Sequence, residues 1–403
     1  MELNNAKQDI QDILSCFTDI FSRPSFAFFS SFIIGFIQLG REVHTSSMVQ
    51  SLTPLSKSLS SFTRFLGKNP WDAEELVNSS LTHFFSSLHI RPRSVVFFIL
   101  DDTIVRKSGK KIPGCAWYKD HAHNMANVFG HQWLLSAFLY QDFLIPLWAK
   151  LYHPHKTKGC GRFYTKVAMA KKMLTHLILP VACKLYLLAD SWYWSKELAL
   201  LCRKQGYHMI SQLKSNSVLV LNGKRTKGNS LVTAPLPYRE VSLPLYGKPK
   251  NLAIAKVVGT IKELGNVAVV IVKEKKKKPC YLISTNIYLP AIDIVKYYAK
   301  RFKIEQMIKD LKQRLGFGDY QVRTLQAILR HVVLSLLSYF VLVFLKILQW
   351  LRNKKSSLSI SIRLLAFYVR KHIIIEHMCV TLQSMKVRFK QNILELYLEK
   401  MCV

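Results

Sequence analysis

Two uninterrupted apolar runs constrain the fold more strongly than any other feature of this sequence. Residues 94–100, Ser-Val-Val-Phe-Phe-Ile-Leu, and residues 185–189, Leu-Tyr-Leu-Leu-Ala, contain no charged side chain. Runs without alternation of apolar and polar residues are typical of central strands that are buried on both faces. The first run ends at Asp101 and Asp102, and the second ends at Asp190. The sequence therefore predicts an α/β core with acidic side chains where two of its strands end.

The segments around these runs alternate between strand and helix patterns. A long loop rich in Lys, Gly and His is predicted from residue 104 to residue 130, and its basic residues could lie along a phosphate backbone. The other predicted elements are a hairpin of two strands over 131–139 and 143–152, helices over 161–179 and 194–205, and a strand over 207–212.

A helix with a polar stripe is predicted over residues 298–315, where apolar residues recur at helical spacing. Four polar residues, spaced three, four and seven positions apart, follow one another along it: Tyr298, Arg301, Glu305 and Lys312. At about 100° per residue they would share one side of a continuous helix, with an acid among cationic and phenolic groups. A solvated pair of Arg301 and Glu305 on an ordinary amphipathic helix would explain only two of the four.

This spacing resembles the Tyr-Arg-Glu-Lys (YREK) signature of DDE transposases encoded by bacterial insertion sequences, and all four positions match. In that family the signature surrounds the third catalytic carboxylate, which corresponds to Glu305 here. The resemblance implies a ribonuclease-H-like, or retroviral-integrase-like, catalytic core, and the predicted order of strands and helices is the order of that fold. In such a core the ends of the first and fourth strands lie side by side. The resemblance covers residues 94–320, and the N-terminal region more loosely.

The resemblance also requires two aspartates upstream, and Asp101 and Asp190 fit that requirement. Asp102 competes with Asp101 for the first place. The family's pattern puts the catalytic aspartate two residues before a Thr, here Thr103, and this favours Asp101. Because neighbouring residues on a strand point to opposite faces, only one of the two can face a metal ion. For a single Asp at a strand end, a turn or capping role would be the usual explanation.

The expected catalytic and metal-binding residues are therefore Asp101, Asp190 and Glu305. Mg²⁺ prefers carboxylate and water oxygens, and two ions about 4 Å apart can activate an attacking oxygen while stabilising the leaving one. The resemblance implies two Mg²⁺ ions, with Mn²⁺ as a substitute.

The resemblance assigns contacts with DNA phosphates to Tyr298, Arg301 and Lys312. It implies a transposase that cuts double-stranded DNA at the terminal inverted repeats of its own element. The freed 3′ hydroxyl is then joined to target DNA, and a homodimer is the expected active form.

The predicted organisation has five parts. They are an N-terminal helical domain that would bind DNA ends (1–90), the first part of the core (91–212), a β-rich insertion (213–289), the second part of the core with the catalytic helix (290–325), and a C-terminal helical region (326–403).

A net charge of +34, from 58 Lys and Arg against 24 Asp and Glu, indicates a polyanionic partner such as nucleic acid. The eight cysteines include no Cys-x-x-Cys pair and are interpreted as reduced thiols. The apolar stretches 26–39 and 332–345 are shorter than the roughly 20 residues that span a bilayer, so they predict buried core helices. With no secretion signal at the N-terminus, we expect a cytoplasmic, nucleoid-associated bacterial protein without a membrane partner.

Three alternatives remain open from the sequence. A nuclease of the same fold would cut DNA without strand transfer. A catalytically inactive copy from a degenerate element would still bind element ends, although the complete set of carboxylates argues against decay of the site. A membrane-associated basic protein is opposed by the shortness of the apolar runs.

Overall fold

The computed structural model describes residues 6–51, 58–109, 111–120, 126–155, 157, 160–214, 217–221, 223–231, 235–353 and 360–384. The chain divides into two compact units. The sheet unit comprises Ile90–Ser108 and Gly114–Ile308, and the helical unit comprises Met1–His89, Gly109–Pro113 and Lys309–Val403.

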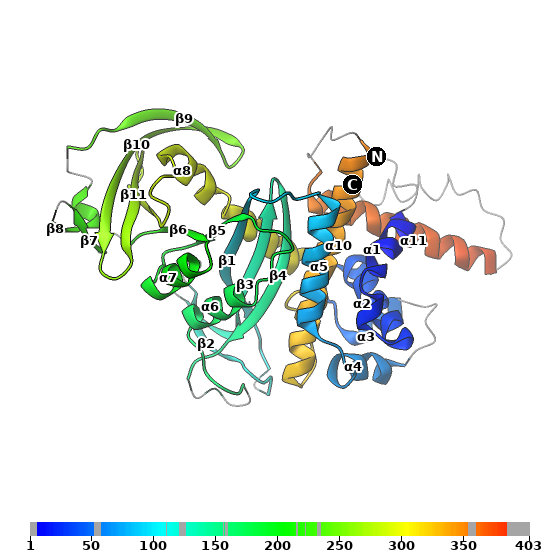
Figure 1. Ribbon diagram of the computed structural model, residues 1–403. Helices are drawn as coiled ribbons and strands as arrows, with labels where there is room; N and C mark the ends of the chain where they lie inside the picture. Colours follow the sequence, from blue (N-terminus) through cyan, green and yellow to red (C-terminus); the bar gives the residue numbers. More distant parts are fainter. Residues whose placement is uncertain are drawn as a thin grey trace. The chain divides into compact units, whose positions relative to one another are not determined.

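All strands of the described residues belong to one mixed sheet in the sheet unit (Figure 1). Their bounds are β1 (Val95–Arg106), β2 (Ala116–Asp120), β3 (Ala126–Tyr140), β4 (Phe143–Tyr152), β5 (Lys184–Ala189), β6 (His208–Gln212), β7 (Val218–Leu221), β8 (Lys224–Lys227), β9 (Arg239–Leu245), β10 (Lys248–Ile261), β11 (Gly265–Glu274) and β12 (Cys280–Ser284). Their order is β2-β3-β1-β5-β6-β12-β11-β10-β7-β8, with β4 paired to β3 and β9 paired to β10. The mixed α/β class predicted from the sequence is confirmed.

The central strands are covered by short helices. β1 runs antiparallel to β3 and parallel to β5, and β5 runs parallel to β6. Phe98 of β1 and Leu187 of β5 are fully buried, as expected for apolar strands in the middle of a sheet. α6 (Lys166–Thr175) packs against β3 and β4, α7 (Lys196–Lys204) packs against β6, and α8 (Ala291–Ala299) packs against β6, β10 and β12.

β1 is longer than the sequence predicts, and Asp101 lies within it rather than at its end. The parallel pairing with β5 covers residues 95–99, but the antiparallel pairing with β3 continues to the end of β1. Gly130 of β3 permits this close pairing, because a Cβ atom there would collide with the carbonyl oxygen of Val105. The predicted loop over 104–130 is therefore wrong in part, since it contains the end of β1, all of β2 and the start of β3.

The segment 213–289 contributes β7 to β12 to the same sheet. β12 pairs antiparallel with β6, and this pairing joins these strands to the central ones. β10 and β11 form a long hairpin in which Ile254 lies opposite Val272. Two of these strands have no clear signal in the sequence: β8 is the polar segment Lys-Arg-Thr-Lys, and β9 contains Pro244, a residue that within sheets is confined to edge strands and strand ends.

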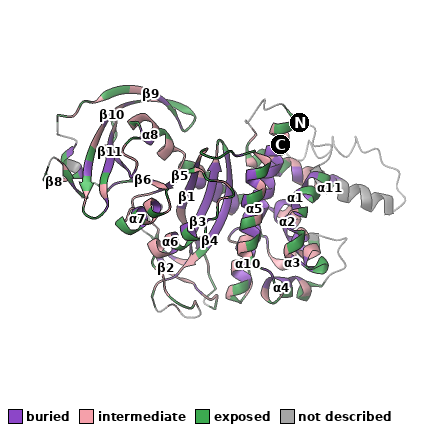
Figure 2. Ribbon diagram, viewed as in Figure 1, coloured by how far each residue is buried: buried purple, intermediate pink, exposed green. Residues whose placement is uncertain are grey.

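α10 (Leu325–Arg352) is the central helix of the helical unit, and most of its residues are buried (Figure 2, purple). The other elements of this unit are α1 (Ala6–Ser15), η1 (Thr18–Ile20), α2 (Arg23–Leu39), α3 (Thr45–Ser51), α4 (Leu59–Gly67), α5 (Ala73–Ser87) and α11 (Ile362–Ser384). α10 packs against α1, α2, α4, α5 and α11. The guanidinium of Arg330 on α10 donates hydrogen bonds to the backbone carbonyl oxygens of Phe65, Leu66 and Trp71, at 3.4, 3.2 and 3.2 Å. The N-terminal and C-terminal segments thus share one core.

By length and composition alone, α10 could cross a membrane. The prediction that this apolar stretch is too short to span a bilayer is therefore wrong, because the helix extends beyond residues 332–345 at both ends. However, 83% of its most apolar window is buried inside the protein. Such burial is typical of a core helix, which agrees with the other half of the prediction.

Candidate active site

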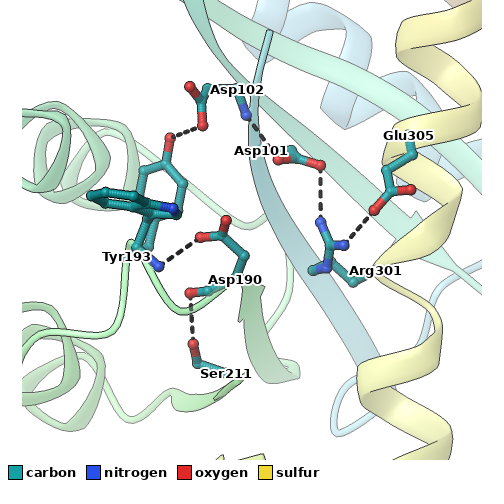
Figure 3. A network of polar contacts seen from close by, with 8 residues as sticks. Asp101, Asp102, Asp190, Tyr193, Ser211, Arg301 and Glu305 are labelled. Atoms are coloured by element: carbon teal, nitrogen blue, oxygen red, sulfur yellow. Dashed lines mark hydrogen bonds and ion pairs between the residues drawn. The ribbon is translucent and has the colours of Figure 1, made fainter. Parts of the chain in front are cut away.

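β1 and β5 bring two acidic residues to one place in the sheet unit. Their parallel register pairs Ile99 with Leu188, so that Asp101 lies level with Asp190 two residues further along. Asp190 directly follows the last residue of β5, and its Oδ1 accepts a hydrogen bond from the backbone N–H of Trp192 at 2.9 Å. Both carboxylates belong to the network of polar contacts in Figure 3.

Arg301 bridges Asp101 and Glu305 (Figure 3). Its Nη1 lies 2.9 Å from Oδ2 of Asp101, and its Nη2 forms an ion pair with Oε1 of Glu305. The side chains of Arg301 and Asp101 are 18% and 15% exposed, and that of Glu305 is 40% exposed. One guanidinium therefore connects a carboxylate of the central strand β1 with a carboxylate of α9 (Phe302–Arg314).

The continuous helix predicted over 298–315 is broken between α8 and α9. Tyr298 lies in the last turn of α8, whereas Glu305 lies in the first turn of α9. The backbone N–H groups of Lys300 and Arg301 donate to the carbonyl oxygens three residues earlier, at 3.0 and 2.9 Å. This tighter 3₁₀ bonding replaces the α-helical pattern. The predicted single stripe on one helix is therefore wrong, and Arg301 lies in the turn between two helices.

Asp102 is held by a separate set of donors. Its Oδ1 accepts a hydrogen bond from the hydroxyl of Tyr193 at 3.2 Å. Its Oδ2 accepts hydrogen bonds from Nζ of Lys166 at 2.7 Å and from Nε2 of Gln132. The backbone N–H of Asp102 in turn donates to Oδ1 of Asp101 at 2.9 Å. Of the two neighbouring aspartates, Asp101 is thus the one that shares a partner with the acidic residue of α9.

Sequence analysis missed the three donors to Asp102. Tyr193 is fully buried, and its backbone N–H donates to the carbonyl oxygen of Asp190 at 3.3 Å. Tyr193 therefore bonds to Asp102 through its hydroxyl and to the backbone of Asp190 through its N–H. Its place three residues after Asp190 is the only signal that could have pointed to it. Lys166 is the first residue of α6 and Gln132 lies within β3, and no motif marks either one.

Burial dominates the electrostatics of these carboxyl groups. It raises the pKa of Asp101 to about 7, although the positive charge of Arg301 acts in the opposite direction. Burial also raises the pKa of Asp190, against the hydrogen bond from the backbone of Trp192. Burial lowers the pKa of Arg301, but the charges of Asp101, Tyr298 and Glu305 and the hydrogen bond to Glu305 together outweigh it, and the net shift is upward. The positive charge of Arg301 is therefore not enough to offset the effect of burial on the pKa of Asp101.

The arrangement of the carboxylates does not form a metal site. Their oxygens are the ligands that a hard divalent cation such as Mg²⁺ prefers. Within the part of the chain that the structure describes, however, no group of three or more His, Cys, Asp or Glu side chains could hold a metal ion. At this site the guanidinium of Arg301 lies between Oδ2 of Asp101 and Oε1 of Glu305. The donor chemistry suits the expected Mg²⁺, and the geometry does not.

The other two predicted DNA-contact residues differ in their positions. The ring centroid of Tyr298 lies 6.0 Å from Cζ of Arg301, and burial raises the pKa of this phenol. Lys312 lies on α9 two turns after Glu305, about 10 Å along the helix axis. The structure therefore places Tyr298 beside Arg301 and places Lys312 further along α9.

An exposed aromatic side chain near Asp190 was also missed by sequence analysis. Trp192 is 61% exposed, and Nζ of Lys214 lies 4.7 Å from its ring centroid. An exposed indole with a cation on its face offers a stacking surface to a base and positive charge to a phosphate.

Comparison with known proteins identifies a family and finds similar solved structures. The family described as "Transposase DDE domain" matches residues 97–341, which is more than half of the chain. No curated protein matches the chain. Among solved structures, the chain is similar to the cryo-EM structure of a piggyBac transposase synaptic complex with hairpin DNA, at 12% identity and a TM-score of 0.47, over 93% of this chain and 74% of that chain. The family match shows that the chain belongs to the transposase DDE domain family, whose members act on DNA and depend on divalent metal ions.

Proposed function

We propose that this transposase cuts DNA at the ends of a bacterial insertion sequence of the YREK group and joins the freed 3′ hydroxyl to target DNA. Asp101, Asp190 and Glu305 are its catalytic carboxylates in this proposal. The observation that carries it is the convergence of three acidic residues from β1, the end of β5 and α9 on one place in the sheet unit, with Arg301 between two of them. A family match alone would not select these three acids from the 24 Asp and Glu of the chain.

The strand order supports a ribonuclease-H-like core. The central part of the sheet has the order β4-β3-β1-β5-β6, with β3 antiparallel and β5 and β6 parallel to β1. In a core of that fold, the two aspartates lie on or at the end of the first and fourth strands; here Asp101 lies on β1 and Asp190 directly follows β5, the fourth strand after β1, β3 and β4. The helical residues 1–90 are proposed to bind the DNA ends, and the strands of 213–289 are proposed to be an insertion in the core.

Mg²⁺ is the proposed cofactor, as two ions, and Mn²⁺ would substitute. Asp101, Asp190 and Glu305 would hold the ions once Arg301 has left its present position. Bound there, the ions would activate the attacking oxygen and stabilise the leaving oxygen of the phosphodiester.

Tyr298, Arg301 and Lys312 are the proposed phosphate contacts. A guanidinium can hold a phosphate through two parallel hydrogen bonds, and an ammonium acts as a point charge. The net charge of +34 supports a double-stranded DNA partner. A homodimer in the DNA complex and a cytoplasmic, nucleoid-associated location without a membrane partner complete the proposal.

The test is a cleavage and strand-transfer assay on DNA that carries the terminal inverted repeats flanking the gene. Wild type is compared with Asp190→Asn and Glu305→Gln, and with Asp142→Asn as a matched control. Asp142 is an exposed acid of the same unit that pairs with Lys303. The proposal expects both reactions from wild type and from the control, and DNA binding without either reaction from the two site variants.

The other outcomes select among the alternatives. Cleavage without joining by wild type would indicate a nuclease of the same fold. Binding of element ends without cleavage by a folded, Mg²⁺-supplied wild type would indicate an inactive DNA-binding copy.

A further inference from the structure

We propose that Arg301 is a latch, which closes the carboxylate site in the DNA-free protein and opens it when a DNA phosphate binds the guanidinium. The inference rests on the proposed function, because it takes Asp101 and Glu305 as metal ligands. It accounts for a disagreement in the structure: these carboxylates have the chemistry of a divalent-cation site but not its geometry.

The bridge differs from an ordinary surface ion pair. Arg301 and Glu305 alone would form an i, i+4 pair, a contact that contributes little to stability when it is exposed to solvent. Here the same guanidinium also binds Asp101, which lies 200 positions earlier in the chain and is mostly buried. Each of its two terminal nitrogens is thus directed at a different carboxylate.

The guanidinium and a metal ion would compete for the same atoms. Arg301 binds Oδ2 of Asp101 and Oε1 of Glu305. A cation shared by both residues needs at least one oxygen from each, and the positive charge that now lies between them opposes its approach. In the DNA-free protein, this bridge therefore opposes metal binding by Asp101 and Glu305.

A DNA phosphate offers Arg301 an alternative partner. A phosphate presents two oxygens to the fork of a guanidinium, as the two carboxylates do in the bridge. Arg301 also lies in the 3₁₀-bonded turn between α8 and α9, and short 3₁₀ segments within helices often mark hinges. When the side chain of Arg301 moves to a DNA phosphate, the carboxylates of Asp101 and Glu305 lose their cationic partner. They can then bind a metal ion beside the DNA backbone.

The consequence is thermodynamic coupling between DNA binding and metal binding. If DNA tightens metal binding by some factor, metal must tighten DNA binding by the same factor. Couplings of this kind are typically about 5-fold to 150-fold. The enzyme would then assemble its metal site on DNA and hold little metal without it.

The experiment is a titration of the full chain with Mn²⁺, in which the electron paramagnetic resonance signal of free Mn²⁺ reports binding. Wild type is compared with Arg301→Gln and with Lys303→Gln, each with and without a terminal-repeat duplex. Lys303→Gln removes the same charge two positions later on α9, where Lys303 pairs with Asp142 and not with the site carboxylates. A titration of the duplex alone gives the Mn²⁺ that DNA binds by itself.

Without DNA, we expect Arg301→Gln to bind Mn²⁺ about tenfold more tightly than wild type, and Lys303→Gln to match wild type. With DNA, we expect wild type to bind Mn²⁺ at least about fivefold more tightly than before, and Arg301→Gln to gain much less. Equal or weaker Mn²⁺ binding by Arg301→Gln in the absence of DNA overturns the latch.

Two further comparisons complete the test. The wild-type protein with and without DNA does not depend on the folding of any variant, and an unchanged Mn²⁺ affinity there also overturns the latch. Failure of the proposed function has a different signature. If Asp101→Asn and Glu305→Gln bind Mn²⁺ as wild type does under both conditions, these carboxylates are not metal ligands.

Discussion

Replacing Asp101 by Asn is expected to flatten the pH dependence of stability of the metal-free protein. Burial raises the pKa of this carboxyl group to about 7, against the charge of Arg301. In the unfolded chain the pKa of an Asp is about 3.9. Between these two values the folded state holds a proton that the unfolded state has released. The free energy of unfolding therefore falls as the pH rises from about 4 to about 7, and this contribution is level above that range.

The size of the effect follows from the shift. A difference of one pKa unit corresponds to about 1.4 kcal/mol, so the complete loss across the window is at most about 4 kcal/mol. Between pH 5.5 and pH 8.0 the loss is about 2 kcal/mol, because part of the window lies below pH 5.5. The side chain of Asp101 is only 15% exposed, so solvent screening reduces this value little. An Asn at this position keeps an oxygen for Arg301 but releases no proton.

Denaturant-induced unfolding in EDTA at these two pH values measures the prediction. Relative to wild type, Asp101→Asn should gain about 2 kcal/mol in the free energy of unfolding from the lower to the higher pH. Asp142→Asn, which removes a carboxylate whose side chain is 51% exposed, is the control and should follow wild type. If the free energy of unfolding changed equally with pH in wild type and in Asp101→Asn, burial would not raise the pKa of this carboxyl group as proposed.

Three further predictions concern residues that the sequence did not single out. Tyr193→Phe should lower the free energy of unfolding by about 1.5–3 kcal/mol, because Asp102 loses a hydrogen-bond donor; denaturant-induced unfolding measures this. The same variant should cleave DNA more slowly than wild type while its DNA affinity is unchanged, which a cleavage assay and a binding assay measure. Arg330→Met should destabilise the protein by about 3–5 kcal/mol in thermal unfolding, because three buried carbonyl oxygens each lose a hydrogen bond and, among the described residues, only that of Phe65 keeps another side-chain donor, Nε1 of Trp71. Arg323→Met, at an exposed position, should have little effect. Trp192→Ala should weaken binding of DNA with an unpaired end by about 1–3 kcal/mol in fluorescence anisotropy, and Trp192→Phe should retain most of the affinity; equal losses in both would exclude stacking.

The predictable part of the fold is the part in which residue pattern and packing agree. β5 lies where the apolar run 185–189 predicts it, and the hairpin of β3 and β4 turns at the predicted place. Both depend on local runs of apolar residues that are long enough to be read without knowledge of the partners. The short polar strand β8 lacks such a run, and its pairing with β7 is the only thing that identifies it as a strand.

The parts of the site that could not be predicted depend on contacts between distant segments. Asp101 looked like the end of a strand because acidic residues disfavour strands, but pairing with β3 carries β1 through it. The break between α8 and α9 has no Pro or Gly to announce it. Spacing could suggest that Arg301 and Glu305 meet, but not that Arg301 also binds Asp101, because that contact exists only once the sheet has formed.

The most direct test of the central claim compares Asp101→Asn with Asp102→Asn for cleavage of terminal-repeat DNA in Mg²⁺, after both variants are shown to bind that DNA. The two residues are neighbours with the same side chain, and they differ in their partners: Asp101 meets Arg301, whereas Asp102 is held by Tyr193 and Lys166. We expect a loss of at least about a thousandfold in cleavage rate for Asp101→Asn and a loss of about 10-fold to 100-fold for Asp102→Asn. Residual cleavage by Asp101→Asn together with none by Asp102→Asn would contradict this expectation.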